Sequence, residues 1–202
     1  MVTSGLRLDS YRRGNVIATQ DLPLRNSGLI ELADRCEDSQ GRYVLFIRRN
    51  GATDVVIAAT GPRWSIVGEF LAYDPVLSPD KRWLAFRTDS AYAVYDLSKN
   101  RTEKLALATV DSFASYSFYW SPDSRTLVFA DTQDFAPRIL LAVFNGDNVR
   151  TYARELSHDD LACGDHRFLR AAAVNGNSVT VAICSAIRQY PRAEFRVLER
   201  PD

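Results

Sequence analysis

The feature that most constrains the fold is a repeat of about 40 residues built around a Ser-Pro-Asp turn. The clearest copy is Trp120–Ala130, and Leu77–Arg87 shares with it the Ser-Pro-Asp, an Arg, a Leu and a Phe in one register. A weaker copy, Asp38–Phe46, keeps the Arg and the Phe and has Gly41 in the turn. The repeated phenylalanines are 40 and 43 residues apart, at Phe46, Phe86 and Phe129. A period near 40 with strand–turn–strand chemistry is typical of β-propeller blades.

Each turn is followed by a segment with the alternation of a β-strand. Ser, Pro and Asp at successive positions suit a type I turn, because Pro pre-sets φ and the Ser and Asp oxygens accept backbone N–H groups. Apolar residues then occupy every second position, which predicts a strand with one better-buried face. These positions are Val44 and Phe46, Leu84 and Phe86, and Leu127 and Phe129. A second apolar strand is expected at 54–59, 91–96 and 138–144.

The Ser-Pro-Asp turn, the Leu-x-Phe strand and the apolar strand after it resemble the repeat of the TolB-like β-propeller family. Residues 77–98 and 120–145 match this pattern well. The copy at 38–60 lacks the Pro and has Gln40 where the other two copies have Asp. The resemblance implies the propeller fold and a habit of binding partners. The motif holds no catalytic residue, so the resemblance implies no reaction.

We therefore expect an all-β fold in which residues 1–202 form one small β-propeller of four blades closed by an N-terminal strand. The blades are expected at about 29–68, 70–107, 113–155 and 168–199. The fourth is the most degraded, because Asn175-Gly176-Asn177 replaces the Ser-Pro-Asp turn. Its third strand is expected at 194–199 and its outer strand is missing. A strand from residues 6–20 would fill that gap beside residues 195–198 and remove two open sheet edges.

Composition bounds the possible functions only broadly. With 202 residues the chain is long enough to form one sizeable hydrophobic core without the help of disulfides or a structural metal. Its 25 basic and 25 acidic residues cancel, so bulk charge does not favour nucleic acid or an anionic membrane as a partner. No apolar run predicts a membrane-spanning helix, and the first residues lack the apolar core of a signal peptide. The expected location is periplasmic or secreted if a leader was removed, and otherwise cytoplasmic.

The longest departure from the repeat lies between the third and fourth blades. It holds both histidines of the chain, three carboxylates and Cys163. His, Asp and Cys are metal-ligand types, so a metal site is one interpretation, although the spacing matches no known metal motif. The favoured interpretation is an acidic, solvated loop. The candidate binding residues are His158, Asp159, Asp160, Asp165 and His166, and the candidate metal ligands among them are His158, Asp160, Asp165 and His166.

Three arginines occupy one position of the repeat and are further candidates for binding: Arg42, Arg82 and Arg125. In a ring of blades they would hold equivalent places and could bind an anion at the mouth of the channel. The interpretation we favour is that each pairs with a carboxylate of an adjacent blade. Three cysteines, Cys36, Cys163 and Cys184, allow at most one disulfide.

The leading functional hypothesis is a non-enzymatic domain that binds another protein through its loop face or rim. Neither Gly-x-Ser-x-Gly nor a phosphate-binding Gly-rich loop occurs, and no cofactor is expected. A fold does not fix a function, so two alternatives stay open. One is a metal-dependent hydrolase or lyase that uses the 157–166 loop. The other is a binder of small molecules or glycans at that loop or at the channel mouth.

Overall fold

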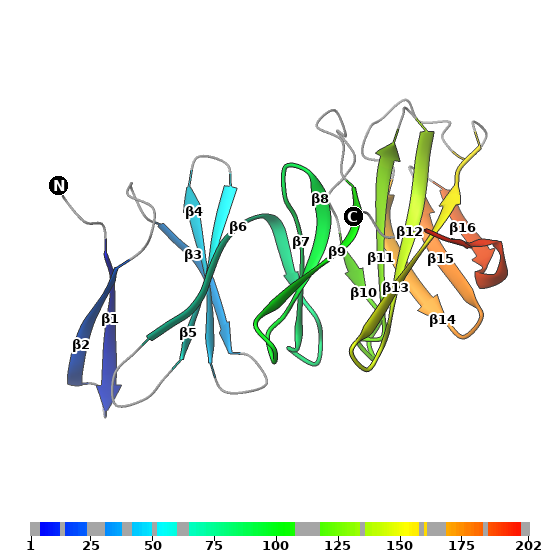
Figure 1. The fold of residues 1–202 in the computed structure, drawn as a ribbon. Coiled ribbons are helices and arrows are strands. Elements are labelled where there is room, and N and C mark those ends of the chain that lie inside the picture. Colours follow the sequence, from blue (N-terminus) through cyan, green and yellow to red (C-terminus); the bar gives the residue numbers. More distant parts are fainter. Residues whose placement is uncertain are drawn as a thin grey trace. The chain divides into compact units, whose positions relative to one another are not determined.

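The computed structural model describes residues 5–12, 15–23, 31–37, 42–49, 52–59, 65–107, 118–133, 136–157, 160, 169–183 and 186–198. These residues form antiparallel β-sheets, with 3-10 conformation at Asp160 and at Arg192–Glu194, and none of them lies in an α-helix (Figure 1). The described part of the chain contains no helix that could cross a membrane. The chain divides into two compact units, Met1–Ala72 and Tyr73–Asp202.

The first unit contains a hairpin and a meander of strands. In the hairpin, β1 (Gly5–Arg12) pairs with β2 (Asn15–Pro23). The meander consists of β3 (Glu31–Glu37), β4 (Tyr43–Arg49), β5 (Ala52–Ala59) and the first part of β6 (Ser65–Leu77). The weaker copy of the repeat predicted a strand around Val44 and Phe46 and a second strand at 54–59, and β4 and β5 are these strands. The apolar alternation predicted for them is visible in Val44, Val55 and Ile57, which are fully buried.

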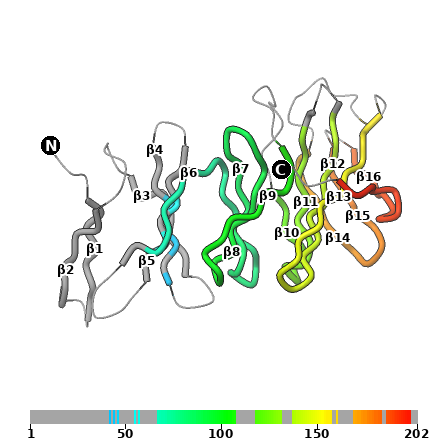
Figure 2. Tube along the Cα trace, in the orientation of Figure 1, coloured from blue at the N-terminus to red at the C-terminus, as the bar shows by residue number. Residues whose placement is uncertain are grey.

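The second unit contains three groups of strands, which Figure 2 follows along the chain trace. In the first group, the end of β6 pairs with β7 (Trp83–Arg87), and β8 (Ala91–Asp96) and β9 (Arg101–Leu107) follow. The second group has the order β10 (Tyr119–Trp120), β11 (Thr126–Gln133), β12 (Ala136–Asn145), β13 (Asn148–Glu155) and β17 (Arg196–Val197). The third group consists of β14 (Leu169–Asn175), β15 (Ser178–Ile183) and β16 (Ala186–Pro191).

The sheet that contains β11 and β12 is buried on both faces. Because side chains alternate along a strand, Leu127 and Phe129 lie in one apolar cluster and Val128 and Ala130 lie in the other. The first cluster joins this sheet to β7–β9 through residues such as Trp83, Tyr92 and Leu105. The second joins it to β14–β16 through residues such as Val179, Val181 and Ile183. Phe86 and Phe129 are buried as the repeat predicts, with exposures of 2% and 1%.

The strand prediction for the last blade is wrong in one respect. Residues 194–199 were expected to be its third strand, but β16 pairs with β15 in that place, and β17 pairs with β13. The chain leaves β16 because Pro191 has no N–H to donate and a 3-10 turn follows it. Phe195 then packs into the second apolar cluster and Leu198 against the first, which holds this segment across β13.

The predicted closure by an N-terminal strand receives no support from the described strands. There β1 pairs with β2, and residues 196 and 197 pair with β13. What the structure establishes is an all-β chain of antiparallel sheets. The number of blades and the closure of a ring stay predictions.

Candidate functional site

The two Ser-Pro-Asp turns have the same hydrogen-bond geometry. The Ser78 hydroxyl donates to Asp80 Oδ1 at 2.5 Å and accepts the backbone N–H of Trp83 at 2.9 Å. In the second turn Ser121 donates to Asp123 at 2.6 Å in the same way. Each Asp also accepts the backbone N–H of the arginine two residues later, at 3.1 and 3.0 Å. The motif therefore serves turn geometry, and its aspartates are engaged within the turn.

The residue after each Asp adopts a left-handed backbone conformation. Lys81 has φ +60° and Ser124 has φ +59°. Residues other than glycine are disfavoured in this conformation, because their Cβ atom lies too close to the following carbonyl oxygen. Ser124 compensates, since its hydroxyl accepts the backbone N–H of Asp80 at 2.9 Å and so connects the two turns.

Arg82, the repeat arginine that follows the first Ser-Pro-Asp turn, lies between two carboxylates. Its guanidinium is 2.8 Å from Asp96 of its own sheet and 2.7 Å from Asp147 of the neighbouring sheet. Burial raises the pKa of Asp96, but hydrogen bonds from Arg82 and Ser98 outweigh burial and leave this pKa below its ordinary value. Lys99 and then Arg82 lower the pKa of Asp147. Arg82 thus pairs with a carboxylate of the adjacent sheet, as expected.

The other two arginines have different surroundings. Arg125 is exposed and lines a cavity of about 570 Å³ beside the second Ser-Pro-Asp turn. Arg42 lies in the first unit and is half-buried. A ring of three arginines around a channel therefore stays a prediction.

Of the five candidate residues in the 157–166 loop, the structure describes only Asp160. His158, Asp159, Asp165 and His166 lie outside the described residues, as does Cys163. Asp160 Oδ2 accepts the backbone N–H and the hydroxyl of Ser157 at 3.0 and 2.9 Å, and Oδ1 accepts the Tyr190 hydroxyl at 3.0 Å. Asp160 therefore connects the start of the loop to β16. Where the structure describes the chain, no group of three or more His, Cys, Asp or Glu side chains could hold a metal ion.

The charge of Asp160 is stabilised by its surroundings. Burial raises its pKa, but the hydrogen bonds from Ser157 and Tyr190, together with the charge of Arg154, leave the pKa below its ordinary value. Tyr190 shows the opposite shift, because burial and then the hydrogen bond to Asp160 raise its pKa to about 12. The pair is thus a neutral phenol that donates to a carboxylate at neutral pH.

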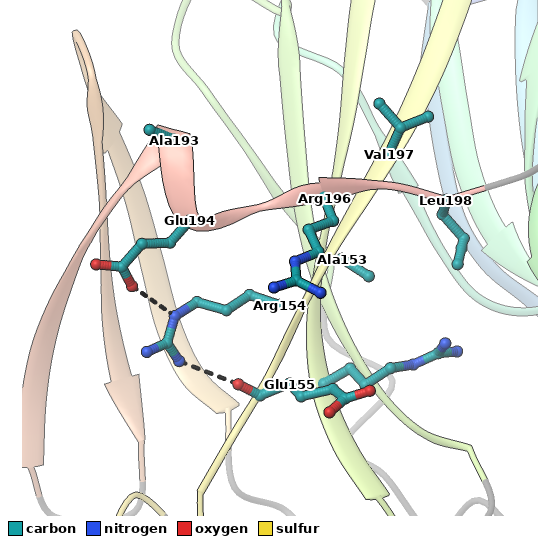
Figure 3. A pocket seen from close by; sticks show the side chains of 9 residues that line it. Ala153, Arg154, Glu155, Ala193, Glu194, Arg196, Val197 and Leu198 are labelled. Atoms are coloured by element: carbon teal, nitrogen blue, oxygen red, sulfur yellow. Dashed lines mark hydrogen bonds and ion pairs between the residues drawn. The ribbon is translucent and has the colours of Figure 1, made fainter.

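Arg154 lines a second cavity, and the sequence analysis did not identify this residue as a candidate. Its guanidinium carbon lies 3.8 Å from the centre of the Tyr190 ring, and its Nε is 2.9 Å from Glu194. It also donates to the backbone oxygen of Glu155 at 3.1 Å (Figure 3). The cavity beside it has a volume of about 560 Å³ and lies between the end of β13 and residues 193–198. The half-buried Arg138, which also lines this cavity, lies 2.5 Å from Asp131.

Nine uncharged residues lie on the outer face of the β14–β16 sheet, and the exposed Arg170 lies beside them at the bulge of β14. Three rows of side chains cross the three strands, and their members are paired in register: Ala171, Ala182 and Ile187; Ala173, Thr180 and Gln189; Asn175, Ser178 and Pro191. We call these nine residues the uncharged face. Ile187 is 77% exposed, and Ala171, Ala173 and Gln189 are exposed as well. The opposite face of the same sheet packs into the second apolar cluster.

Comparisons with known proteins give little further information. No family model matches the chain, and no curated protein matches it. Among solved structures the chain is similar to TolB from Acinetobacter baumannii, with a TM-score of 0.34 and 14% sequence identity. The match covers 82% of this chain and 54% of that one, so the chain spans about half the length of that structure.

Proposed function

We propose that the chain is a non-enzymatic interaction domain that associates with a second copy of itself through the uncharged face. The observation that carries this proposal is the composition of that face. Charged residues make up 25% of the chain, so about two would be expected among any nine residues, and more on a surface. Antiparallel sheets that face water normally present polar and charged side chains.

The chemistry of the face suits packing against another sheet. Ala171, Ala173 and Ala182 are small, so a second sheet could approach to about 10 Å, the ordinary distance between packed sheets. None of the nine residues carries a charge that would lose its hydration in the contact, and such a loss is the largest cost of burying a surface. Ile187 would gain most, because burial of apolar area contributes about 25 cal/mol per Å². The other face of this sheet is already covered in the same manner by β11 and β12.

A second copy is the partner that the shape and the chemistry favour. The nine uncharged residues can face a second copy of themselves, because a two-fold axis parallel to the strands would place each row opposite the same row of the other copy. The nine residues are fewer than the 20 to 30 per partner of a standard interface, so we expect weak, concentration-dependent association.

Sedimentation velocity on the full chain tests the proposal. Over about 1 µM to about 1 mM, where weak interfaces dissociate, the chain should pass from monomer to dimer. Thr180→Glu places a charge in the middle row and should keep the chain monomeric. Thr102→Glu is the matched control, because Thr102 is an exposed strand threonine on β9, and this variant should dimerise like the parent. A parent that stays monomeric, or a Thr180→Glu variant that dimerises normally, would refute the proposal.

A further inference from the structure

The two clear repeats can be aligned through equivalent backbone hydrogen bonds. The carbonyl of Arg82 accepts the N–H of Leu97, and the carbonyl of Arg125 accepts the N–H of Phe144, both at 2.9 Å. The residue before Leu97 is Asp96 and the residue before Phe144 is Val143. Val143 therefore occupies the place that Asp96 holds beside Arg82.

The hairpins that face the two arginines can be aligned as well. Both are two-residue turns, closed by Asn145 paired with Asn148 and by Asn175 paired with Ser178. Both begin with a left-handed glycine, at φ +61° and +55°, which is the geometry that a type II′ hairpin requires. The second turn residue is Asp147 in one hairpin and Asn177 in the other.

Both carboxylates that hold Arg82 thus have neutral counterparts around Arg125. Among the described residues, no carboxylate lies within ion-pair distance of the Arg125 guanidinium. The space beside it is the cavity of about 570 Å³, which extends from the second Ser-Pro-Asp turn to Val174 and Gly176 at the β14–β15 hairpin. A second arginine, Arg192, also lines this cavity.

The charges in this cavity favour an anion. Arg125 and Arg192 contribute two positive charges, and Asp123 contributes the only negative charge among the residues that line it. Asp123 Oδ1 is occupied by the Ser121 hydroxyl and the Arg125 N–H, at 2.6 and 3.0 Å. Arg192 is held in place by one hydrogen bond from Nη2 to Thr126 Oγ1 at 2.7 Å, which leaves other N–H groups of its guanidinium for a ligand.

We infer that this cavity binds a carboxylate, with Arg125 as the main cation and Arg192 as a second donor. The external carboxylate takes the place that Asp96 and Asp147 take at Arg82. A guanidinium suits this role because its parallel N–H groups match the two oxygens of a carboxylate. The carboxylate can belong to an acidic side chain of a bound polypeptide or to a small organic acid.

NMR of the full chain can detect this site directly. We expect the Nε–Hε signals of Arg125 and Arg192 to shift saturably with glutarate and to stay in place with glutaramide, which has the same shape but no charge. Acetyl-Gly-Glu-Gly-amide, compared with its Gln version, distinguishes the two sources of the carboxylate. Binding about tenfold tighter than that of glutarate assigns the site to a polypeptide, and the reverse order assigns it to a small acid.

Three variants test the assignment of the residues. Arg125→Gln should abolish the glutarate response, and Arg150→Gln, an exposed arginine of β13, should preserve it. Asn177→Asp places a carboxylate at the turn position that Asp147 holds in the other hairpin, so it should weaken glutarate binding about two- to fivefold, the range expected for an exposed ion pair. The inference is overturned if no probe causes a saturable shift, if Arg125→Gln binds as the parent does, or if Asn177→Asp leaves binding unchanged.

Discussion

The backbone N–H of Asp80 donates a hydrogen bond to the hydroxyl of Ser124, which lies 44 residues later in the chain and 2.9 Å away. The residues belong to equivalent turns of successive repeats, and Ser124 is buried. Ser124 has a left-handed backbone conformation, in which glycine is normally favoured, and this bond is an interaction that a glycine there could not make.

The left-handed turn positions should respond differently to glycine. Lys81→Gly relieves Cβ crowding in the folded state, which costs about 1–2 kcal/mol. It also increases the conformational entropy of the unfolded chain, which opposes folding by about 0.5–1 kcal/mol. The free energy of unfolding should therefore rise by up to about 1 kcal/mol. Ser124→Gly has the same backbone effect but loses the bond to Asp80. It should be at least about 1 kcal/mol less favourable than Lys81→Gly in urea unfolding. Equal effects of the two changes would contradict the role of the Ser124 hydroxyl.

Phe129 should be one of the most costly residues to truncate. Its ring lies 5.1 Å from that of Tyr92 and 5.7 Å from that of Phe118. Phe129→Ala should lower the free energy of unfolding by about 3–5 kcal/mol. Leu107→Ala is the control, because Leu107 is 51% exposed and its truncation should cost within about 0.5 kcal/mol. A Phe129→Ala cost below about 1 kcal/mol would show that the strand register is wrong.

The Arg82–Asp96 pair should make stability depend on pH in the acidic range. The folded-state pKa of Asp96 is lowered, so its contribution is complete above the unfolded pKa of about 4 and disappears as pH falls through the folded value. Asp96→Asn should destabilise the chain by about 1.5–3 kcal/mol at pH 7, and by less in acid. Asp147→Asn is the matched control and should change stability less, because Asp147 is exposed. Equal losses at pH 7 would exclude burial as the reason that Asp96 matters.

Tyr190 should give stability an alkaline dependence. Its folded-state pKa is raised to about 12, so its contribution is complete below the unfolded pKa of about 10 and is lost between about pH 10 and 12. Tyr190→Phe should remove this part of the pH dependence and should remove a phenol that titrates near pH 12 from an absorbance titration. A loss of absorbance change near pH 10 instead of near pH 12 in Tyr190→Phe would show that Tyr190 ionises as an ordinary tyrosine.

The segment that crosses β13 should be held mainly by its aromatic anchor. Phe195 is buried and Val197 is 66% exposed, although both belong to the segment that crosses β13. Phe195→Ala should cost about 3–5 kcal/mol and speed hydrogen exchange at Leu198, whose N–H donates to Thr151. Val197→Ala should change stability by about 0.5 kcal/mol or less. Comparable exchange at Leu198 in both variants would show that the anchor lies elsewhere.

The features that were predicted correctly, the turns and the buried phenylalanines, depend on residues close together in the sequence. Ser-Pro-Asp fixes its turn through bonds that span at most five residues, and the alternation after it places Phe86 and Phe129 inside. The strand at 186–191 was missed because Arg188 and Gln189 interrupt its apolar pattern. The partner of residues 196 and 197 could not be predicted either, because β13 lies in an earlier repeat and nothing local selects it.

The candidate site likewise combines features that depend on local sequence with features that depend on how distant strands pair. The repeat identified Arg82 and Arg125 as equivalent, but the loss of carboxylates around Arg125 becomes visible only when the strand register aligns Asp96 with Val143. Arg154 and Tyr190 gave no sequence signal, since their stacking joins strands of different sheets. Four of the five loop candidates lie outside the described residues, so their roles stay predictions.

The burial of both faces of the β10–β13 sheet has a consequence for folding cooperativity. Leu127 and Phe129 belong to one core while Val128 and Ala130 belong to the other, so a single strand is shared by both. If β14–β16 or β7–β9 detached, the β10–β13 sheet would expose one apolar face to water. Its other face would still be packed in the remaining core. Such partly open states are high in free energy, and the second unit should therefore unfold in one step rather than repeat by repeat.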